Sequence, residues 1–138
     1  MYNMERIIIT IKEIEKYKHD LSEYSIKKIF DLKDKKTFYA SSMLVFTILN
    51  KIIDLGNDIL VSEHVGAPQT SLDTMLLLAK AGIMNEKEAQ QLNKLVAKRN
   101  DFAHFYGTID EKNLFYLIEN LHSVDSFIEK IKKRVKLK

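Results

Sequence analysis

Apolar residues recur at intervals of three and four along most of the chain, which is the period of amphipathic α-helices. The spacing predicts a first helix over about residues 3–30, with room for a bend near Ser22–Ser25, and a second and longest helix over about residues 35–62. Gly56 lies on the apolar face of the second helix, where glycine costs about 1 kcal/mol relative to alanine. We therefore expect another helix to approach Gly56 closely.

Capping residues divide the next part of the chain into two further helices. Thr70 or Ser71 can cap a short helix that stops at Gly82. Asn85 is followed three residues later by Glu88, which predicts a capping box at the start of the next helix. Both helices carry an apolar face.

Thr108 and Glu111 predict another capping box, and the apolar face of the helix that they open continues to Val135. One proline and four glycines leave little material for turns, which favours long helices with few connections. The expected fold class is therefore all-α, an antiparallel bundle of four to five helices in one domain that spans residues 1–138.

Composition narrows the classes of function. Hydrophobic content of 46% with 30% charged residues is typical of a soluble globular protein. The chain has no cysteine, which excludes disulfides and fits the cytoplasm, and it has no apolar run of the ~20 residues that a membrane span needs. The four histidines lie too far apart to pair on a helix and there is no glycine-rich phosphate loop, so we expect no metal site and no cofactor.

The net charge of +3 permits contact with RNA but does not argue for it. Basic residues are concentrated in the last nine positions, 130–138. Two roles that do not exclude each other are open for them. They complement the carbonyl end of the last helix, or they attract the phosphates of a nucleic acid.

The segment from Arg99 to Tyr106 departs from the amphipathic pattern. Arg99 lies in an apolar stripe between Val96 and Ala103, where a charge is costly to bury without a partner. Either its stem carries the guanidinium to solvent, or the stripe faces a pocket that needs a cation. His104 follows five residues later and either flanks the same groove or caps the last turn. A guanidinium, an imidazole and an accessible phenol together suit chemistry on phosphates.

A polar ridge runs along the second helix, formed by Asn50, Asp54 and Asn57 at steps of four and three. One interpretation is an ordinary solvated face. The other is that Asp54 lies across from Arg99 and helps to hold it.

The spacing Arg-x4-His-x-Tyr, formed here by Arg99, His104 and Tyr106, resembles the signature of the HepT-type toxins of the HEPN ribonuclease superfamily. The helical layout over about residues 35–130 is similar as well. The resemblance implies a homodimer in which the motif helices of two protomers meet, and a composite cleft that carries both Arg/His pairs. It also implies a type VII toxin–antitoxin system, in which the partner is a cognate minimal nucleotidyltransferase antitoxin.

The resemblance further implies that RNA is cleaved without a metal ion. His104 would act as general base or acid, and Arg99 would stabilise the charge that grows on the phosphoryl oxygens. Asn100 or Asp101 would orient the substrate or His104. Tyr106 matches the tyrosine that the antitoxin adenylylates, and an AMP group there would block RNA by repulsion and occlusion. The alternative function is a non-catalytic helical partner that binds nucleotide or supports a nucleotidyltransferase.

Overall fold

The computed structural model describes residues 1–104 and 109–137, and it describes all of their side chains except those of residues 102–104. The described residues form α-helices joined by short connections, with no strand, so the all-α class is confirmed. The elements are α1 (Met4–Ser22), the short 3-10 helix η1 (Ile29–Leu32), α2 (Lys35–Ser62), α3 (Ser71–Lys80), α4 (Glu86–His104), α5 (Glu111–Glu119) and α6 (His122–Arg134). None of these helices is both long and apolar enough to cross a membrane.

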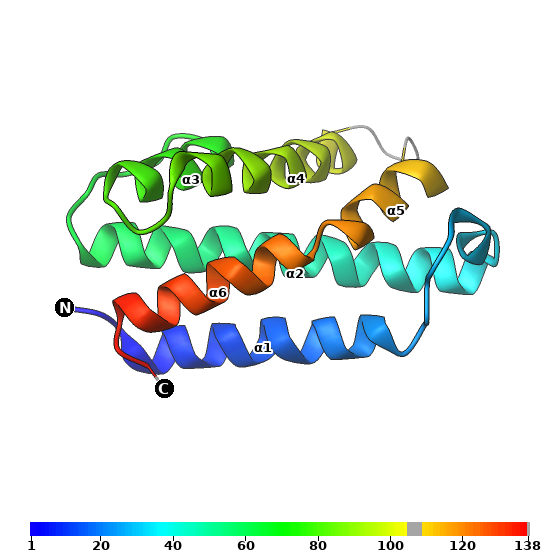
Figure 1. The fold of residues 1–138 in the computed structure, drawn as a ribbon, viewed down its shortest axis with the longest axis horizontal. Coiled ribbons are helices and arrows are strands. Elements are labelled where there is room, and N and C mark those ends of the chain that lie inside the picture. The colour runs from blue at the N-terminus through cyan, green and yellow to red at the C-terminus, as the bar shows by residue number, and fades with distance from the viewer. Residues whose placement is uncertain (105–108, 138) are drawn as a thin grey trace.

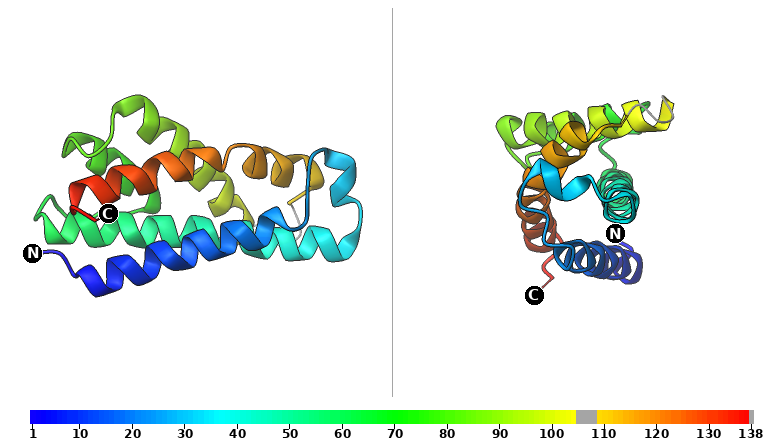
Figure 2. Two further views of the ribbon diagram at one scale, coloured as in Figure 1. Left: turned by 60° about the horizontal axis from the view of Figure 1, so that its bottom comes forward. Right: turned by 90° about the vertical axis from the view of Figure 1, so that its right-hand side faces the viewer.

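The longest helix, α2, is the centre of the bundle and has the bounds predicted from the sequence. Figure 1 shows α1 along one side of α2 and α4 along the other, both running antiparallel to it, while α5 and α6 return across the molecule. The end-on view in Figure 2 likewise places α1 and α4 on opposite sides of α2. Apolar side chains of α2 that face these neighbours are fully buried, including Val45, Ile48, Leu49, Ile52, Leu55, Ile59 and Leu60.

Two of the predicted caps are confirmed and one is wrong. The Thr70 hydroxyl accepts a hydrogen bond from the N–H of Asp73 at the start of α3. At the start of α4, Asn85 Oδ1 accepts from the Glu88 N–H at 2.8 Å and Glu88 Oε1 accepts from the Asn85 N–H at 3.0 Å. The third predicted cap is wrong, because the N-cap of α5 is Asp110 and not Thr108, which lies outside the described residues. The Asp110 carboxylate accepts a hydrogen bond from the N–H of Asn113 at 2.8 Å.

The first helix ends at Ser22, so its predicted continuation to about residue 30 is wrong. The Ser22 hydroxyl donates to the carbonyl of His19, and Ser25 adopts a positive φ of 50°, which no α-helix accommodates. Ile29 and Phe30 were expected on the apolar face of this helix. They lie in η1 instead and are 43% and 66% exposed.

The last helix is interrupted between α5 and α6. Asn120 ends α5, because its side-chain N–H donates to the carbonyl of Tyr116 at 2.8 Å and its Oδ1 accepts from Gln91 of α4 at 3.2 Å. The side chain thereby competes with the helical backbone and is fixed to a neighbouring helix. With α5 and α6 taken as one interrupted helix, the described residues form five α-helices, which is within the predicted range of four to five.

Gly56 lies where α2 and α3 pack together, as predicted. A Cβ atom at this position would stand 2.7 Å from Thr74 Cγ2 and 3.1 Å from Leu78 Cδ1. Both neighbours are fully buried, and the Thr74 hydroxyl donates to Asn57 Oδ1 at 2.7 Å. The glycine therefore permits a close contact that offsets its low helix propensity.

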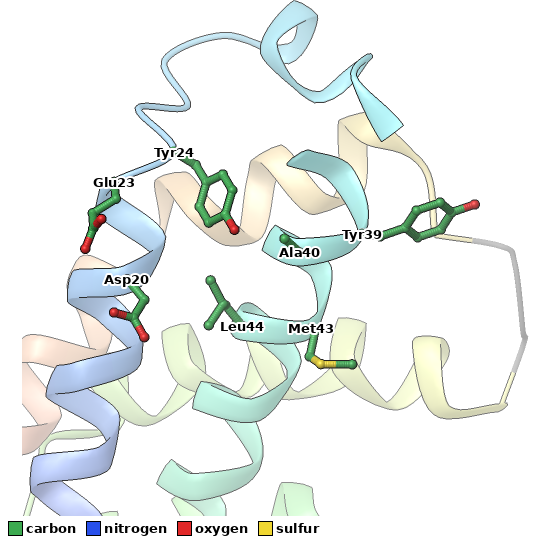
Figure 3. A pocket seen from close by; sticks show the side chains of 7 residues that line it. All are labelled: Asp20, Glu23, Tyr24, Tyr39, Ala40, Met43 and Leu44. Atoms are coloured by element: carbon green, nitrogen blue, oxygen red, sulfur yellow. The ribbon is translucent and has the colours of Figure 1, made fainter. Parts of the chain in front are cut away.

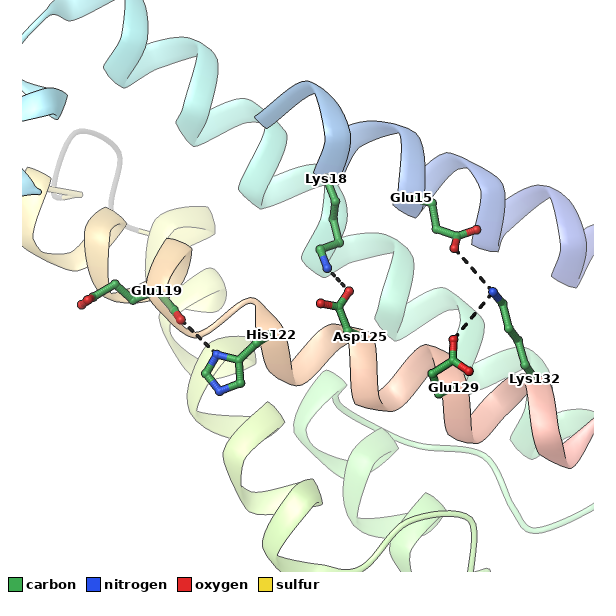
Figure 4. A network of polar contacts seen from close by, with 7 residues as sticks. All are labelled: Glu15, Lys18, Glu119, His122, Asp125, Glu129 and Lys132. Atoms are coloured by element: carbon green, nitrogen blue, oxygen red, sulfur yellow. Dashed lines mark hydrogen bonds and ion pairs between the residues drawn. The ribbon is translucent and has the colours of Figure 1, made fainter. Parts of the chain in front are cut away.

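Several charges of the basic C-terminal segment are used within the bundle. Lys130 pairs with Glu88 at 3.0 Å, and Lys132 pairs with Glu15 at 3.4 Å and with Glu129 at 3.8 Å. Figure 4 shows Lys132 between these two carboxylates, beside the ion pair of Lys18 with Asp125. The pairs with Glu88 and Glu15 hold α6 against α4 and α1, which is a structural use of these charges that was not predicted.

Candidate functional site

Arg99 lies near the end of α4 and is half-buried against α2. Its Nε donates a hydrogen bond to Asn50 Oδ1 at 2.5 Å, which joins two residues that are 49 positions apart. The guanidinium carbon stands 5.2 Å from the centre of the Phe46 ring, one turn earlier on α2. This stacking and the hydrogen bond fix the plane of the guanidinium.

Asn100 connects Arg99 to α3. Its Oδ1 accepts from Arg99 Nη1 at 2.8 Å, and its side-chain N–H donates to the Ser71 hydroxyl at 3.1 Å. These two contacts orient the amide, with its nitrogen toward Ser71 and its oxygen toward Arg99. The hydrogen bonds around Arg99 thus link three helices: Asn50 of α2 contacts the guanidinium directly, and Ser71 of α3 contacts it through Asn100 of α4.

The partners of Arg99 are neutral. Within the described part of the chain, no carboxylate forms an ion pair with Arg99. Two amide oxygens orient the guanidinium but carry no charge to offset its own. A half-buried guanidinium held in this way keeps its positive charge for an anionic ligand.

A second cation near the end of α4 is held in the same manner. Lys98 Nζ donates to Asn113 Oδ1 of α5 at 3.1 Å and stands 4.9 Å from the centre of the Tyr116 ring. Its partners are again an amide and an aromatic face, and no ion pair of Lys98 occurs among the described residues. Adjacent Lys98 and Arg99 therefore place two cations without described ion pairs near this end of α4.

The structure brings some of the predicted site residues together and separates others. Asn100 contacts Arg99, as already described, whereas Asp101 is exposed at the next position of α4. Asp54 is exposed and makes no hydrogen bond or ion pair with Arg99; the residue that holds Arg99 is Asn50, one turn earlier on α2. The prediction that Asp54 lies across from Arg99 and holds it is corrected, because Asn50 is the residue of α2 that contacts Arg99.

His104 is the last residue of α4, five positions after Arg99, and its side chain lies outside the described atoms. Tyr106 lies outside the described residues altogether. The roles predicted for both residues therefore stay predictions.

Sequence reasoning missed Phe46 and Ser71 and assigned no role to Asn50. Asn50 belongs to the predicted polar ridge of α2, so the ridge itself was a usable signal. The choice between its members depends on the register of α2 against α4, which no local pattern encodes. Ser71 was considered only as a cap of α3, and its contact with Asn100 follows from packing between α3 and α4.

The comparisons with known proteins agree with this architecture. The sequence profile of the family described as Ribonuclease HepT-like matches residues 7–131. A protein of Shewanella oneidensis named mRNA nuclease HepT is 30% identical over 81 residues, which are 58% of this chain. The aligned part spans 61% of the length of that relative.

Two solved structures share the fold across nearly the whole chain. The cytosolic protein YutE of Bacillus subtilis superposes with a TM-score of 0.85 at 24% identity, covering 99% of this chain and 94% of that one. A tri-AMPylated HEPN toxin of Shewanella oneidensis, in complex with an MNT antitoxin, superposes with a TM-score of 0.84 at 23% identity, covering 96% and 99% of the two chains. Because the profile matches most of its length, the chain belongs to the Ribonuclease HepT-like family.

Proposed function

We propose that this chain, a single helical domain over residues 1–138, is a toxin that cuts RNA internally without a metal ion, with Arg99 and His104 as its catalytic residues. The observation that carries the proposal is the charge of Arg99, which amides hold in place and no carboxylate of the described residues neutralises. A fixed donor of this kind stabilises charge that develops on phosphoryl oxygens, because it needs no reorganisation during the reaction. The family membership and the name of the Shewanella relative, an mRNA nuclease, support the same activity.

In the proposed reaction, the ribose 2′-oxygen forms a bond to the adjacent phosphorus and the bond from phosphorus to the 5′-oxygen breaks. His104 removes the proton of the 2′-hydroxyl or supplies one to the leaving 5′-oxygen. Arg99 binds the non-bridging oxygens, where negative charge accumulates. Asn100 acts as a positioning residue, because it holds the guanidinium from the side of α3. The products are a cyclic phosphate and a free 5′-hydroxyl.

We infer that the active form is a homodimer whose two Arg99 sites face each other. Tyr39 and Met43 of α2 are 69% and 71% exposed, although both are large and apolar. Figure 3 shows them leaving α2 on the side away from α1, and helical spacing places them in line with Phe46 and Asn50. A second copy that covers this stripe would bring its own Arg99 toward the same cleft, and exposed apolar residues in such a row favour a protein interface.

We also propose that a minimal nucleotidyltransferase antitoxin silences the chain by adenylylating Tyr106. The structural neighbour described as a tri-AMPylated HEPN toxin in complex with an MNT antitoxin supports this partner. An AMP group on Tyr106, eight residues beyond Lys98 and seven beyond Arg99, would add negative charge where RNA phosphates are expected. The B. subtilis neighbour is described as cytosolic, and we place this chain in the cytoplasm as well.

The direct test uses the purified full-length chain and a defined RNA oligonucleotide. We expect cleavage that persists in excess EDTA and that stops when the nucleotide at the cleaved position carries a 2′-deoxyribose. Arg99→Ala and His104→Ala should each lose activity, whereas Lys12→Ala, which removes an exposed lysine of α1, should retain it. Cleavage of the deoxy substrate, or full activity of either site variant, would contradict the proposed mechanism.

A growth assay separates the toxin from a non-catalytic partner subunit. Induction of the unmodified chain should stop growth, and induction of Arg99→Ala or His104→Ala should not. Equal toxicity of all three chains, or none in any of them, would reject the ribonuclease assignment. Co-expression of the antitoxin should restore growth and add AMP to Tyr106, as mass spectrometry of the peptide would show, and Tyr106→Phe should remain toxic.

A further inference from the structure

A second concave site lies on α4, away from Arg99. A cavity of about 310 Å³ separates the first half of α4 from α6. Its floor is apolar and consists of Met84, Leu92 and Phe127, which are 5%, 2% and 2% exposed. A flat ring laid against these side chains would be shielded from water on one face.

The rim of the cavity is polar and carries more positive than negative charge. Lys87 and Lys130 line it together with Glu88, His122 and two serines, Ser123 and Ser126. Glu88 Oε1 accepts from both Lys130 Nζ at 3.0 Å and the N–H of Asn85 at 3.0 Å. These two donors hold the pKa of Glu88 below its usual range, so this carboxylate is already satisfied within the fold.

Because Lys130 is paired with Glu88, Lys87 accounts for the excess positive charge of the rim. It is exposed where it lines the cavity, and no ion pair of Lys87 occurs among the described residues. Ser123 and Ser126, from the first turns of α6, line the same cavity. A lysine that shares a cavity with two hydroxyl groups is suited to a phosphate or a carboxylate.

His122 adds a directional acceptor to the rim. Its Nδ1 lies 3.0 Å from the carbonyl oxygen of Glu119, a contact drawn in Figure 4. A carbonyl oxygen only accepts, so Nδ1 carries the hydrogen and Nε2 of the neutral ring is the acceptor. The imidazole can therefore accept from a ring N–H or a hydroxyl of a ligand.

We propose that this cavity binds a small organic anion that combines a flat ring with a phosphate group, of the size of a mononucleotide. The apolar floor takes the ring, and Lys87 with the two serines takes the phosphate. The volume is at the lower end of the range of ligand pockets, which run from about 300 to 1,000 Å³. The site is separate from Arg99, which lies seven residues or about 10 Å beyond Leu92 along the axis of α4. The proposal therefore does not depend on ribonuclease activity.

The test titrates the full-length chain with AMP, with adenosine and with inorganic phosphate, and follows backbone amide shifts by NMR. AMP should cause saturable shifts at His122, Ser123 and Ser126. Adenosine and phosphate should each bind at least about tenfold more weakly, since each lacks one half of the ligand. Lys87→Ala should weaken AMP binding by about tenfold, because a charge-assisted hydrogen bond is lost. Ser126→Trp, which fills the cavity from an exposed position, should abolish it.

Two variants serve as controls. Lys133→Ala removes an exposed lysine from α6 outside the cavity and should bind AMP normally. Arg99→Ala should also bind AMP normally, which distinguishes this cavity from the RNA site. The proposal is overturned if AMP shifts are lost in Arg99→Ala, if adenosine or phosphate alone binds as tightly as AMP, or if no saturable shift occurs. It is also overturned if the same amides shift with protein concentration and no longer respond to AMP, because a protein surface would then cover the cavity.

Discussion

Arg99 and Arg134 each join helices that are far apart in the sequence, but they do so with different partners. Arg134, at the end of α6, makes a two-point contact with Glu63 beyond the end of α2, with Nε to Oε2 at 2.9 Å and Nη2 to Oε1 at 2.6 Å. The hydroxyl of Tyr2 donates to the same carboxylate, so the start of the chain is fixed there too. Among the described residues, the hydrogen-bond acceptors of Arg99 are the amide oxygens of Asn50 and Asn100.

The two arginines differ in whether a neighbouring carboxylate offsets their positive charge. The carboxylate of Glu63 offsets the charge of Arg134, and its own pKa is lowered chiefly by the hydrogen bond from Arg134. The amides around Arg99 give comparable orientation without any such compensation. Arg134 therefore serves to close the fold, whereas no described residue supplies an anion for Arg99.

The largest expected effect comes from removing each arginine in turn. Arg99→Ala should lower kcat/KM for RNA cleavage by about 10²–10³-fold, the range seen when one fixed donor to a developing oxyanion is lost. Its free energy of unfolding should fall by about 1 kcal/mol, since hydrogen bonds to neutral amides are lost and no ion pair among the described residues is broken. Arg134→Ala should lower stability and leave kcat/KM unchanged. Cleavage kinetics and urea unfolding of both variants check this, and similar losses of activity in both would refute the comparison.

The second prediction tests whether the packing of α3 against Gly56, away from Arg99, helps to position Arg99. Gly56→Ala places a methyl group 2.7 Å from Thr74 Cγ2, and Thr74 cannot turn away without losing its 2.7 Å hydrogen bond to Asn57. We expect a loss of about 2 kcal/mol in unfolding free energy. Because α3 also carries Ser71, its displacement should weaken the Ser71–Asn100 contact and lower kcat/KM.

The matched control for this prediction removes only the clashing atom. Thr74→Ser deletes Cγ2 and keeps the hydroxyl, so Gly56→Ala combined with Thr74→Ser should recover most of the stability and activity lost in Gly56→Ala alone. A double-mutant cycle measured by urea unfolding gives the coupling energy. Additive effects of the two substitutions would show that the contact at Gly56 does not constrain α3.

Local signals predicted much of the fold. The bounds of α2, the Asn85–Glu88 capping box and the close contact at Gly56 each depend on residues near one another in the sequence or on the period of one helix. The cap of the last helix was misplaced because Thr108 and Asp110 are both good N-cap residues two positions apart. The break at Asn120 was missed because its partner Gln91 is on another helix.

The candidate site was predicted only in part, for a related reason. Arg99 was identifiable because a charge interrupts an apolar stripe, and Asn100 because it is adjacent. The choice of Asp54 over Asn50 followed from the expectation that a half-buried cation needs an anion. The structure shows an amide in that place, and the distinction depends on the axial register between α2 and α4. The pairing of Arg134 with Glu63, 71 positions apart, was equally beyond any local pattern.

The third prediction concerns a substitution that gives Arg99 a carboxylate partner like the one that Arg134 has. Asn50→Asp places a carboxylate against Arg99 Nε and makes its environment resemble that of Arg134. Activity should fall by about tenfold, because the new charge competes with the RNA phosphate, while stability should stay the same or rise slightly. Asp54→Asn is the matched control, since it changes a charge one turn away at an exposed position and should leave kcat/KM unchanged. Full activity of Asn50→Asp would show that the charge of Arg99 is not used.

The smallest expected effect concerns the pH dependence of the Arg134 site. The folded pKa of Glu63 is below its ordinary value of 4.5, so its contribution to stability is fully present above that pH and is lost as the pH falls through the folded pKa. Glu63→Gln keeps a neutral acceptor for Arg134 and should cost about 1 kcal/mol at neutral pH. The difference between the unmodified chain and Glu63→Gln should therefore shrink as the pH drops below about 4.5. Urea unfolding at pH 7 and at successively lower pH measures it, and a difference that stays constant across that range would mean that the carboxylate charge adds nothing beyond the amide contact seen at Arg99.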